Sequence, residues 1–177
     1  SVAARGLGDV YKRQIPAGFT HHPAEQLACR LVEKLPSPLS RVFYSDNGST
    51  AVEIALKMAL QYWKNQGVQN RTRFLSFTGA YHGDTLGAMS VGAPSLFNDA
   101  FREVLFEVDY VPFPAPFQDD AQEEEKESRT LQKLERQLEK KSGHYAAMIL
   151  EPLVQGAAGM RLCRGAFLLR LEELLQH

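Results

Sequence analysis

Hydrophobic positions along the chain switch repeatedly between helical spacing and short continuous runs. Apolar side chains recur every three or four residues in 23–35 and in 52–63, and these segments end at Pro36 and before Gly67. Between them, the β-branched and aromatic run 41–45 predicts a strand. The first third of the regular sequence therefore predicts a helix, a strand and a second helix.

The same alternation continues towards the end of the sequence. The remaining elements are predicted, in chain order, as strand 73–77, helix 85–91, strand 104–111, a surface helix with Leu131, Leu134 and Leu138 on one face, strand 145–150 and a helix from Gly165. The run 145–150 is apolar throughout, as expected for a strand buried on both faces of a parallel sheet. This order predicts an α/β fold with a mostly parallel sheet, which binds ligands at the carboxyl ends of its strands.

Composition and charge narrow the possible partners. Of 177 residues 44% are hydrophobic, and 20 basic against 21 acidic side chains leave a net charge of -1, so we expect no nucleic-acid or membrane-surface partner. Cys29 and Cys163 lie far apart, which predicts a reduced cytoplasmic chain without a metal site. Residues 1–14 show no structural period; we expect a non-native artefact there and a folded part over 15–177.

The first segment with candidate chemistry is SDNGST at 45–50, directly before a predicted helix. Free backbone N–H groups and the positive dipole end at a helix start bind phosphate. Gly48 lets a ligand approach the backbone closely, and the hydroxyl of Ser49 adds a donor. The alternative is an ordinary helix cap, a common role of Ser and Thr.

The second segment is GAYHGDT at 79–85, which follows a predicted strand. The ring of Tyr81 is suited to stacking on a flat ligand while its hydroxyl stays available, and His82 or Asp84 would position polar groups. The alternative is a glycine-rich loop in which Asp84 caps the helix that begins at Thr85.

The third segment begins with Glu151, directly after the apolar run, and continues as QGAAG at 155–159. A carboxylate at the end of a buried strand is costly unless it is paired or lies in a cleft. This position therefore predicts a functional site, the alternative being a side chain that faces solvent at the edge of the sheet.

Taken together and in this order, these segments resemble a known enzyme family. The stretches that carry the likeness are FTHHPAEQLACRLVEKLP, FYSDNGSTAVEIALKMALQYW, FTGAYHGDTLGAMSVG and ILEPLVQGAAGM. They resemble the class III, fold type I aminotransferases that use pyridoxal 5′-phosphate. The resemblance implies that 15–177 is part of the large cofactor-binding domain of such an enzyme, and that the intact enzyme is a homodimer.

The resemblance also implies roles for individual residues. Gly48 and Ser49 match the pair that holds the cofactor phosphate, and Tyr81 matches the aromatic side chain that stacks on the pyridine ring. Asp84 matches a position near the substrate, and Glu151 matches a glutamate close to the partner of the ring nitrogen. No residue here matches the family's cofactor-bound lysine, so the chain is expected to be a fragment that is inactive alone.

One departure from the family pattern bears on the substrate. Many relatives that use 2-oxoglutarate carry a glutamate where Ala157 and Ala158 stand here. The resemblance therefore implies S-adenosylmethionine as amino donor and 8-amino-7-oxononanoate as acceptor, giving 7,8-diaminononanoate for biotin synthesis. Two alternatives stay open: a class III aminotransferase for ω-amino acids, and a non-catalytic module for phosphate binding or dimerisation.

Overall fold

A computed structural model describes residues 21–117 and 119–176. The chain divides into two compact units, one before Ser45 and one from Ser45 onward, which are described separately. The artefact that we predict at 1–14 lies outside the described residues.

The first unit contains helix α2 (His22–Lys34), which confirms the helix predicted over 23–35. His21 caps this helix, since its Nδ1 accepts the N–H of Ala24 at 3.1 Å. The strand predicted at 41–45 is wrong: these residues are irregular and pair with no other strand of the described chain. A side-chain bond from the Tyr44 hydroxyl to the carbonyl of Ala24 (2.6 Å) connects the end of this segment to the helix instead.

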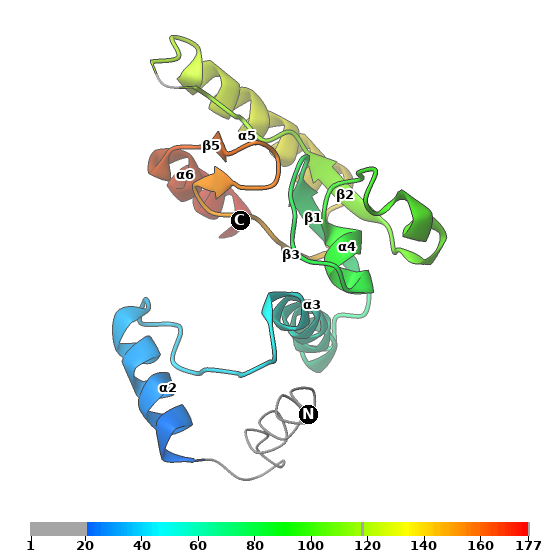
Figure 1. The fold of residues 1–177 in the computed structure, drawn as a ribbon. Coiled ribbons are helices and arrows are strands. Elements are labelled where there is room, and N and C mark those ends of the chain that lie inside the picture. Colours follow the sequence, from blue (N-terminus) through cyan, green and yellow to red (C-terminus); the bar gives the residue numbers. More distant parts are fainter. Residues whose placement is uncertain (1–20, 118, 177) are drawn as a thin grey trace, which may run out of the picture. The chain divides into compact units, whose positions relative to one another are not determined.

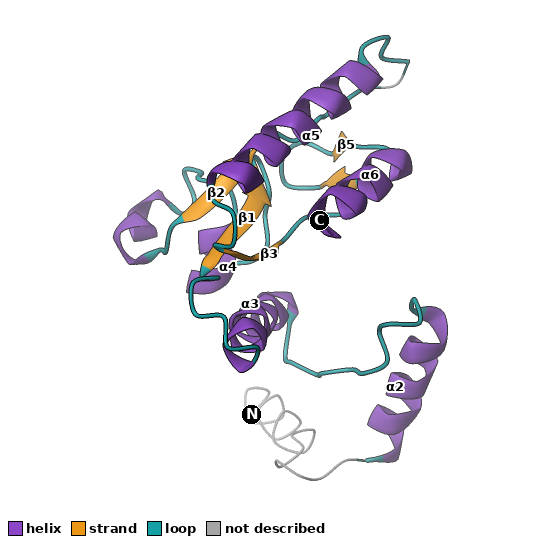
Figure 2. Ribbon diagram, turned by 180° about the vertical axis from the view of Figure 1, so that it is seen from behind, coloured by secondary structure: helices purple, strands orange, loops and turns teal. Residues whose placement is uncertain are grey.

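The second unit is built around a parallel sheet with the strand order β2-β1-β3 (Figures 1 and 2). Its strands are β1 (Arg73–Phe77), β2 (Val108–Val111) and β3 (Tyr145–Met148). The helices are α3 (Gly48–Asn65), α4 (Leu86–Val91), α5 (Glu123–Lys140) and α6 (Gly165–Gln176), with a 3-10 helix at Asp99–Val104. A small antiparallel hairpin of β4 (Val154–Gln155) and β5 (Arg161–Leu162) precedes α6. The predicted α/β fold with a parallel sheet is thereby confirmed.

Two hydrophobic layers cover the sheet because successive side chains of β1 point to opposite faces. Leu75 and Phe77 pack with Leu134 of α5 and Phe167 of α6. Phe74 packs on the other face, in a smaller cluster with residues of α3 and α4. Full burial of each such side chain contributes about 1.5–3 kcal/mol, which makes β1 the centre of the core.

Two strands are shorter than the sequence predicts. The run 104–111 pairs only from Val108, because the residues before it form the 3-10 helix and a turn. The run 145–150 forms a strand only to Met148 and is half-buried beyond Tyr145, so the prediction of burial on both faces is wrong. The reason is position: β1 is central, whereas β3 is the last strand on its side of the described sheet.

Helix α5 confirms the helix predicted from the leucine spacing, and Arg129 pairs with Glu125 as their spacing indicates. However, this helix is not solvated all round. The carboxylate of Glu127 is fully buried and accepts two bonds from Arg164, at 2.6 and 3.1 Å. An ion pair between the buried Glu127 and the partly exposed Arg164 therefore connects α5 to the start of α6.

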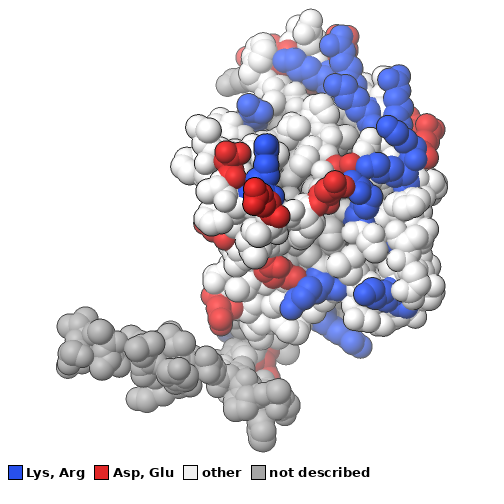
Figure 3. All heavy atoms as spheres, turned by 90° about the vertical axis from the view of Figure 1, so that its right-hand side faces the viewer, with Lys and Arg blue, Asp and Glu red and all other residues white. Residues whose placement is uncertain are grey.

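The charged side chains visible on one face of the molecule are of both signs and lie interspersed between uncharged areas (Figure 3). This distribution agrees with the balanced composition. None of the helices in the described ranges is long and apolar enough to cross a membrane.

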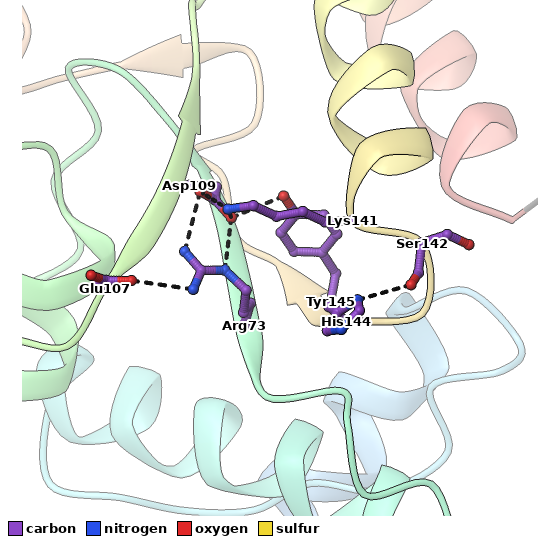
Figure 4. A network of polar contacts seen from close by, with 7 residues as sticks. All are labelled: Arg73, Glu107, Asp109, Lys141, Ser142, His144 and Tyr145. Carbon is purple, nitrogen blue, oxygen red and sulfur yellow. Dashed lines mark hydrogen bonds and ion pairs between the residues drawn. The ribbon is translucent and has the colours of Figure 1, made fainter.

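The amino end of the sheet is held by one carboxylate, Asp109 of β2 (Figure 4). It accepts bonds from Arg73 of β1 (2.9 Å), from Lys141 at the end of α5 (2.7 Å) and from the hydroxyl of Tyr145 of β3 (2.9 Å). Burial raises the pKa of Asp109, but these three donors outweigh it and lower the pKa to about 2. All three strands are thus joined at their starts.

Candidate active site

The carboxyl end of the sheet brings the three predicted segments together. The loop after β1 contains Tyr81 and Asp84, the segment after β3 contains Glu151, and the start of α3 contains Ser49. Parallel strands end at the same edge of a sheet, which explains why loops distant in sequence meet here. The contacts below join all three segments.

Glu151 joins the loop after β1 to the loop after β3. Its Oε1 accepts the N–H of Tyr81 at 3.0 Å, and its Oε2 accepts the N–H of Gly156 at 2.9 Å. The alternative in which this carboxylate merely faces solvent is therefore wrong. A carboxylate with two backbone donors fixes both loops at once, since such charge-assisted bonds are short and directional.

Ser49 joins the start of α3 to the same loop. Its Oγ accepts the N–H of Asp84 at 3.0 Å. Gly83 has a φ of +126°, and a Cβ built on it would lie 2.1 Å from this oxygen. Only glycine fits at this contact, because both its backbone angle and the available space exclude a side chain.

The start of α3 keeps two backbone donors free. The side chain of Asn47 accepts the N–H of Thr50 at 3.0 Å, and the hydroxyl of Thr50 accepts the N–H of Asn47 at 3.1 Å, which forms a capping box. Among the described residues nothing accepts the N–H groups of Gly48 and Ser49. The cap therefore does not use the N–H groups of Gly48 and Ser49, which stay available to an anion.

Tyr81 is half exposed, and its hydroxyl donates to Oδ2 of Asp84 at 2.8 Å. This hydrogen bond raises the pKa of Tyr81, so the phenol stays protonated. Asp84 does not cap α4, because Thr85 is the N-cap residue and lacks a side-chain cap bond. Glu53 of α3 takes that role: its Oε1 accepts the N–H groups of Gly87 (2.6 Å) and Ala88 (3.3 Å).

His82 points back towards the sheet, where its Nε2 lies 3.5 Å from Oγ of Ser76 on β1. Burial lowers the pKa of His82, although the negative charge of Glu151 acts in the opposite direction. The imidazole is therefore neutral at pH 7, and it lies between the loop and strand β1.

A cavity of about 530 Å³ opens beside this cluster. Tyr81, Asp84, Ala157, Ala158 and Arg161 contribute to its wall. A second hollow of about 560 Å³ is lined from Met89 to Tyr110 and contains none of the predicted site residues. Of the predicted site residues, Tyr81 and Asp84 line the first cavity.

Comparison with protein families decides the relationship, since the model of the aminotransferase class-III family matches residues 12–177. The chain belongs to the class-III aminotransferase family. It is 55% identical over 160 residues to an adenosylmethionine-8-amino-7-oxononanoate aminotransferase of Synechococcus elongatus. That match covers 90% of this chain and 37% of the relative, so the chain spans just over a third of that protein's length.

Solved structures of class-III proteins share the fold. An adenosylmethionine-8-amino-7-oxononanoate aminotransferase from Methanocaldococcus jannaschii matches 96% of this chain and 37% of its own, with a TM-score of 0.80 and 32% identity. An amine transaminase from an uncultivated Pseudomonas species, solved in its PLP-bound form, matches 92% of this chain and 38% of its own, with a TM-score of 0.83 and 33% identity.

Three residues that line or support the site were not among the site residues predicted from the sequence. Glu53 lies inside a regular helix, so only the distant partner at Gly87 reveals its role. Arg161 and Gln155 belong to a hairpin of two-residue strands, which is too short to produce a detectable alternation. Pro152, Gly156 and Gly159 were the only residues in this segment that indicated a turn.

Proposed function

We propose that this chain is the cofactor-binding part of an aminotransferase that uses pyridoxal 5′-phosphate. The observation that carries the proposal is the joining of Ser49, Tyr81, Asp84 and Glu151 by backbone and side-chain bonds at the carboxyl end of the sheet. The resemblance to the family implies cofactor contacts for Ser49, Tyr81 and Glu151 and a substrate contact for Asp84, so their joining supports a common site.

The residues present fit this cofactor chemically. Two free amides and a hydroxyl at the start of α3 suit a phosphate dianion, and a Cβ on Gly48 would meet nothing within 4 Å, so the approach is open. Gln155 is fully buried, yet both polar atoms of its side chain lack a partner among the described residues. A buried amide of this kind indicates a polar group that completes the site.

Each residue then has a defined task. Gly48 and Ser49 hold the phosphate, and the ring of Tyr81 covers one face of the pyridine and excludes water from it. Glu151 fixes the loop that carries Tyr81, and Asp84 orients the Tyr81 hydroxyl towards the substrate side. When bound, pyridoxal 5′-phosphate supplies the electron sink that allows an amino group to be moved between two carbon skeletons.

We propose S-adenosylmethionine as the amino donor and 8-amino-7-oxononanoate as the acceptor. The 55% identity to the Synechococcus relative supports this pair, as do Ala157 and Ala158, which remove the carboxylate found in 2-oxoglutarate users. An amine transaminase is the second candidate, favoured by the TM-score of 0.83 to the Pseudomonas protein. Binding of S-adenosylmethionine in preference to a simple amine would support S-adenosylmethionine as the amino donor.

We further propose a cytoplasmic homodimer. Leu96 and Phe97, in the loop after α4, are 95% and 93% exposed, and apolar side chains exposed to this extent favour a protein partner. Cys29 and Cys163 are free thiols, which suits a reducing compartment. Sedimentation velocity measures the oligomeric state directly.

The experiment that tests the cofactor site is calorimetric titration of the chain with pyridoxamine 5′-phosphate. We expect saturable binding, weakened about tenfold by Ser49→Ala, which removes one charge-assisted bond, and by Tyr81→Ala, which removes the stacking ring. Tyr62→Ala, an exposed tyrosine on α3, is the control and should bind as wild type. Equal affinities in all four proteins would contradict the proposed site.

A further inference from the structure

The peptide bond between Ala80 and Tyr81 is held on both sides. Its N–H, which belongs to Tyr81, donates to Oε1 of Glu151 at 3.0 Å. Its carbonyl, which belongs to Ala80, accepts the N–H of Ala93 at 2.7 Å. A planar peptide unit whose two polar groups are bonded to separate segments cannot rotate without breaking one of these bonds. The direction in which the Tyr81 side chain leaves the backbone therefore depends on Ala93 as well as on Glu151.

Ala93 directly follows the end of α4, and Tyr110 of β2 holds this end. The Tyr110 hydroxyl donates to the carbonyl of Ser90 at 2.8 Å and to that of Gly92 at 2.7 Å, so that its one proton is shared between two acceptors. Carbonyls at the end of a helix lack a partner within the helix, which makes them available to such a donor. Burial raises the pKa of Tyr110 to about 12, so the phenol keeps its proton at pH 7.

The sheet gives this hydroxyl a fixed base. Tyr110 lies on the same face of β2 as Val108, which packs against the hydrophobic cluster that α3 and α4 share. Ser90 adds a second connection, since its buried Oγ donates to the carbonyl of Leu86 at 2.7 Å and accepts the N–H of Phe106 at 3.1 Å. The end of α4 is therefore bonded both to β2 and to the segment before it.

Tyr110 acts on the site from outside its cavity. The wall of the cavity beside Tyr81 includes Gly92 and Ala93, whereas Tyr110 lines the second hollow. Contacts thus run from the Tyr110 hydroxyl through the end of α4 to the peptide bond that precedes the Tyr81 side chain. They connect the site to β2, the strand of the described sheet whose own following loop contains none of the predicted site residues.

We propose that Tyr110 is a positioning residue for the candidate active site, because its hydroxyl fixes the end of α4 and thereby orients the ring of Tyr81. The inference deepens the proposed function and rests on it, since it takes this ring as the group that lies on the cofactor. A stacking contact depends on the orientation of both rings, so a small rotation of the peptide unit before Tyr81 lowers the affinity.

The test begins with Tyr110→Phe, which removes the hydroxyl and keeps the ring. In calorimetric titration with pyridoxamine 5′-phosphate we expect the affinity to fall about fivefold, the change that corresponds to about one hydrogen bond. Tyr145→Phe is the matched control, because its hydroxyl donates to Asp109 at 2.9 Å at the other end of the sheet. It should bind within about twofold of wild type. Thermal unfolding checks that both variants are folded.

A double-mutant cycle separates positioning from a general loosening of the fold. In the background of Tyr81→Ala, Tyr110→Phe should change the affinity less than about twofold, because the ring that it orients is then absent. An undiminished loss in that background would overturn the proposal. Wild-type affinity of Tyr110→Phe alone would overturn it as well.

Hydrogen exchange of the cofactor-free chain tests the same contacts without any ligand. The amides of Tyr81 and Ala93 should exchange about fivefold faster in Tyr110→Phe than in wild type, and within about twofold of wild type in Tyr145→Phe. Equal exchange in the three proteins would contradict the role of Tyr110. If the wild-type chain bound no pyridoxamine 5′-phosphate, the proposed function would fail, and the exchange rates alone would then decide whether Tyr110 holds the loop that carries Tyr81.

Discussion

The two ends of the parallel sheet differ in how completely their polar groups are paired within the fold. At the amino end, Asp109 accepts bonds from Arg73, Lys141 and Tyr145, so that each of these polar groups has a partner within the fold. At the carboxyl end, the free amides at the start of α3, Gln155 and Arg161 have no partner among the described residues. Both ends belong to the same three short strands, so the difference comes from the side chains and loops at each end.

The difference shows how one sheet separates stability from binding. A carboxylate surrounded by donors stabilises the folded chain but has nothing left to offer a ligand. The buried amide of Gln155, which lacks a partner, costs desolvation that a bound polar group can recover, whereas the exposed donors of Gly48 and Arg161 remain available to a ligand. We therefore expect substitutions at the amino end to change the free energy of unfolding, and substitutions at the carboxyl end to change ligand affinity.

The largest effect is expected where the carboxyl end also depends on backbone geometry. Gly83→Ala places a Cβ 2.1 Å from Oγ and 2.8 Å from Cβ of Ser49, at a backbone φ of +126°. The loop must shift, so we expect a loss of about 3 kcal/mol in urea unfolding together with loss of pyridoxamine 5′-phosphate binding. Gly83 is thus an exception to the separation of the two ends, because a substitution there is expected to change both the free energy of unfolding and ligand affinity.

Gly67→Ala is the matched control for this substitution. Gly67 also has a positive φ, +77°, but a Cβ there would meet nothing within 4 Å. It should cost about 1 kcal/mol through backbone strain alone and leave ligand binding unchanged. Similar losses at the two glycines would show that the contact with Ser49 does not constrain the loop.

At the amino end, Asp109→Asn should cost about 2 kcal/mol in urea unfolding, because Lys141 then loses its ion pair and Arg73 keeps only its pair with the exposed Glu107. The groups are partly exposed, which keeps the loss below that of a fully buried pair. Affinity for pyridoxamine 5′-phosphate should stay within about twofold of wild type, since the site lies at the other end of the strands. A larger change in affinity would contradict the separation of the two ends.

Acid provides an independent measure of the same carboxylate. The pKa of Asp109 is lowered to about 2 from its ordinary 3.8, so its contribution is present above the unfolded value and is lost as the pH falls through the folded value. The difference in unfolding free energy between wild type and Asp109→Asn should therefore shrink between about pH 5 and pH 2. A difference that stays constant over this range would assign the loss to packing.

The sequence was sufficient for those features that a local pattern determines. The spacing of apolar residues predicted α2 within one residue at each end and indicated α3 and α5, and β1 was predicted with its observed bounds. The turn-rich segments located Gly48, Tyr81 and Glu151. A run of apolar residues does not reveal whether a strand has partners on both sides, which is why 41–45 and 145–150 were predicted wrongly. Long-range polar contacts leave even less trace, as Asp109 shows: its donors lie 32 to 36 residues away.

The smallest effect is expected at Glu53, which supports the site without belonging to it. Its carboxylate accepts the N–H groups of Gly87 and Ala88 and thus caps α4 from a neighbouring helix. Glu53→Ala should cost about 1 kcal/mol, the usual value of a lost cap, and should weaken pyridoxamine 5′-phosphate binding only about twofold. Glu135→Ala, on the exposed side of α5, should change neither quantity. If Glu53→Ala weakened binding as strongly as Tyr81→Ala, the position of α4 would control the Tyr81 loop directly, and the boundary between support and site would have to include Glu53.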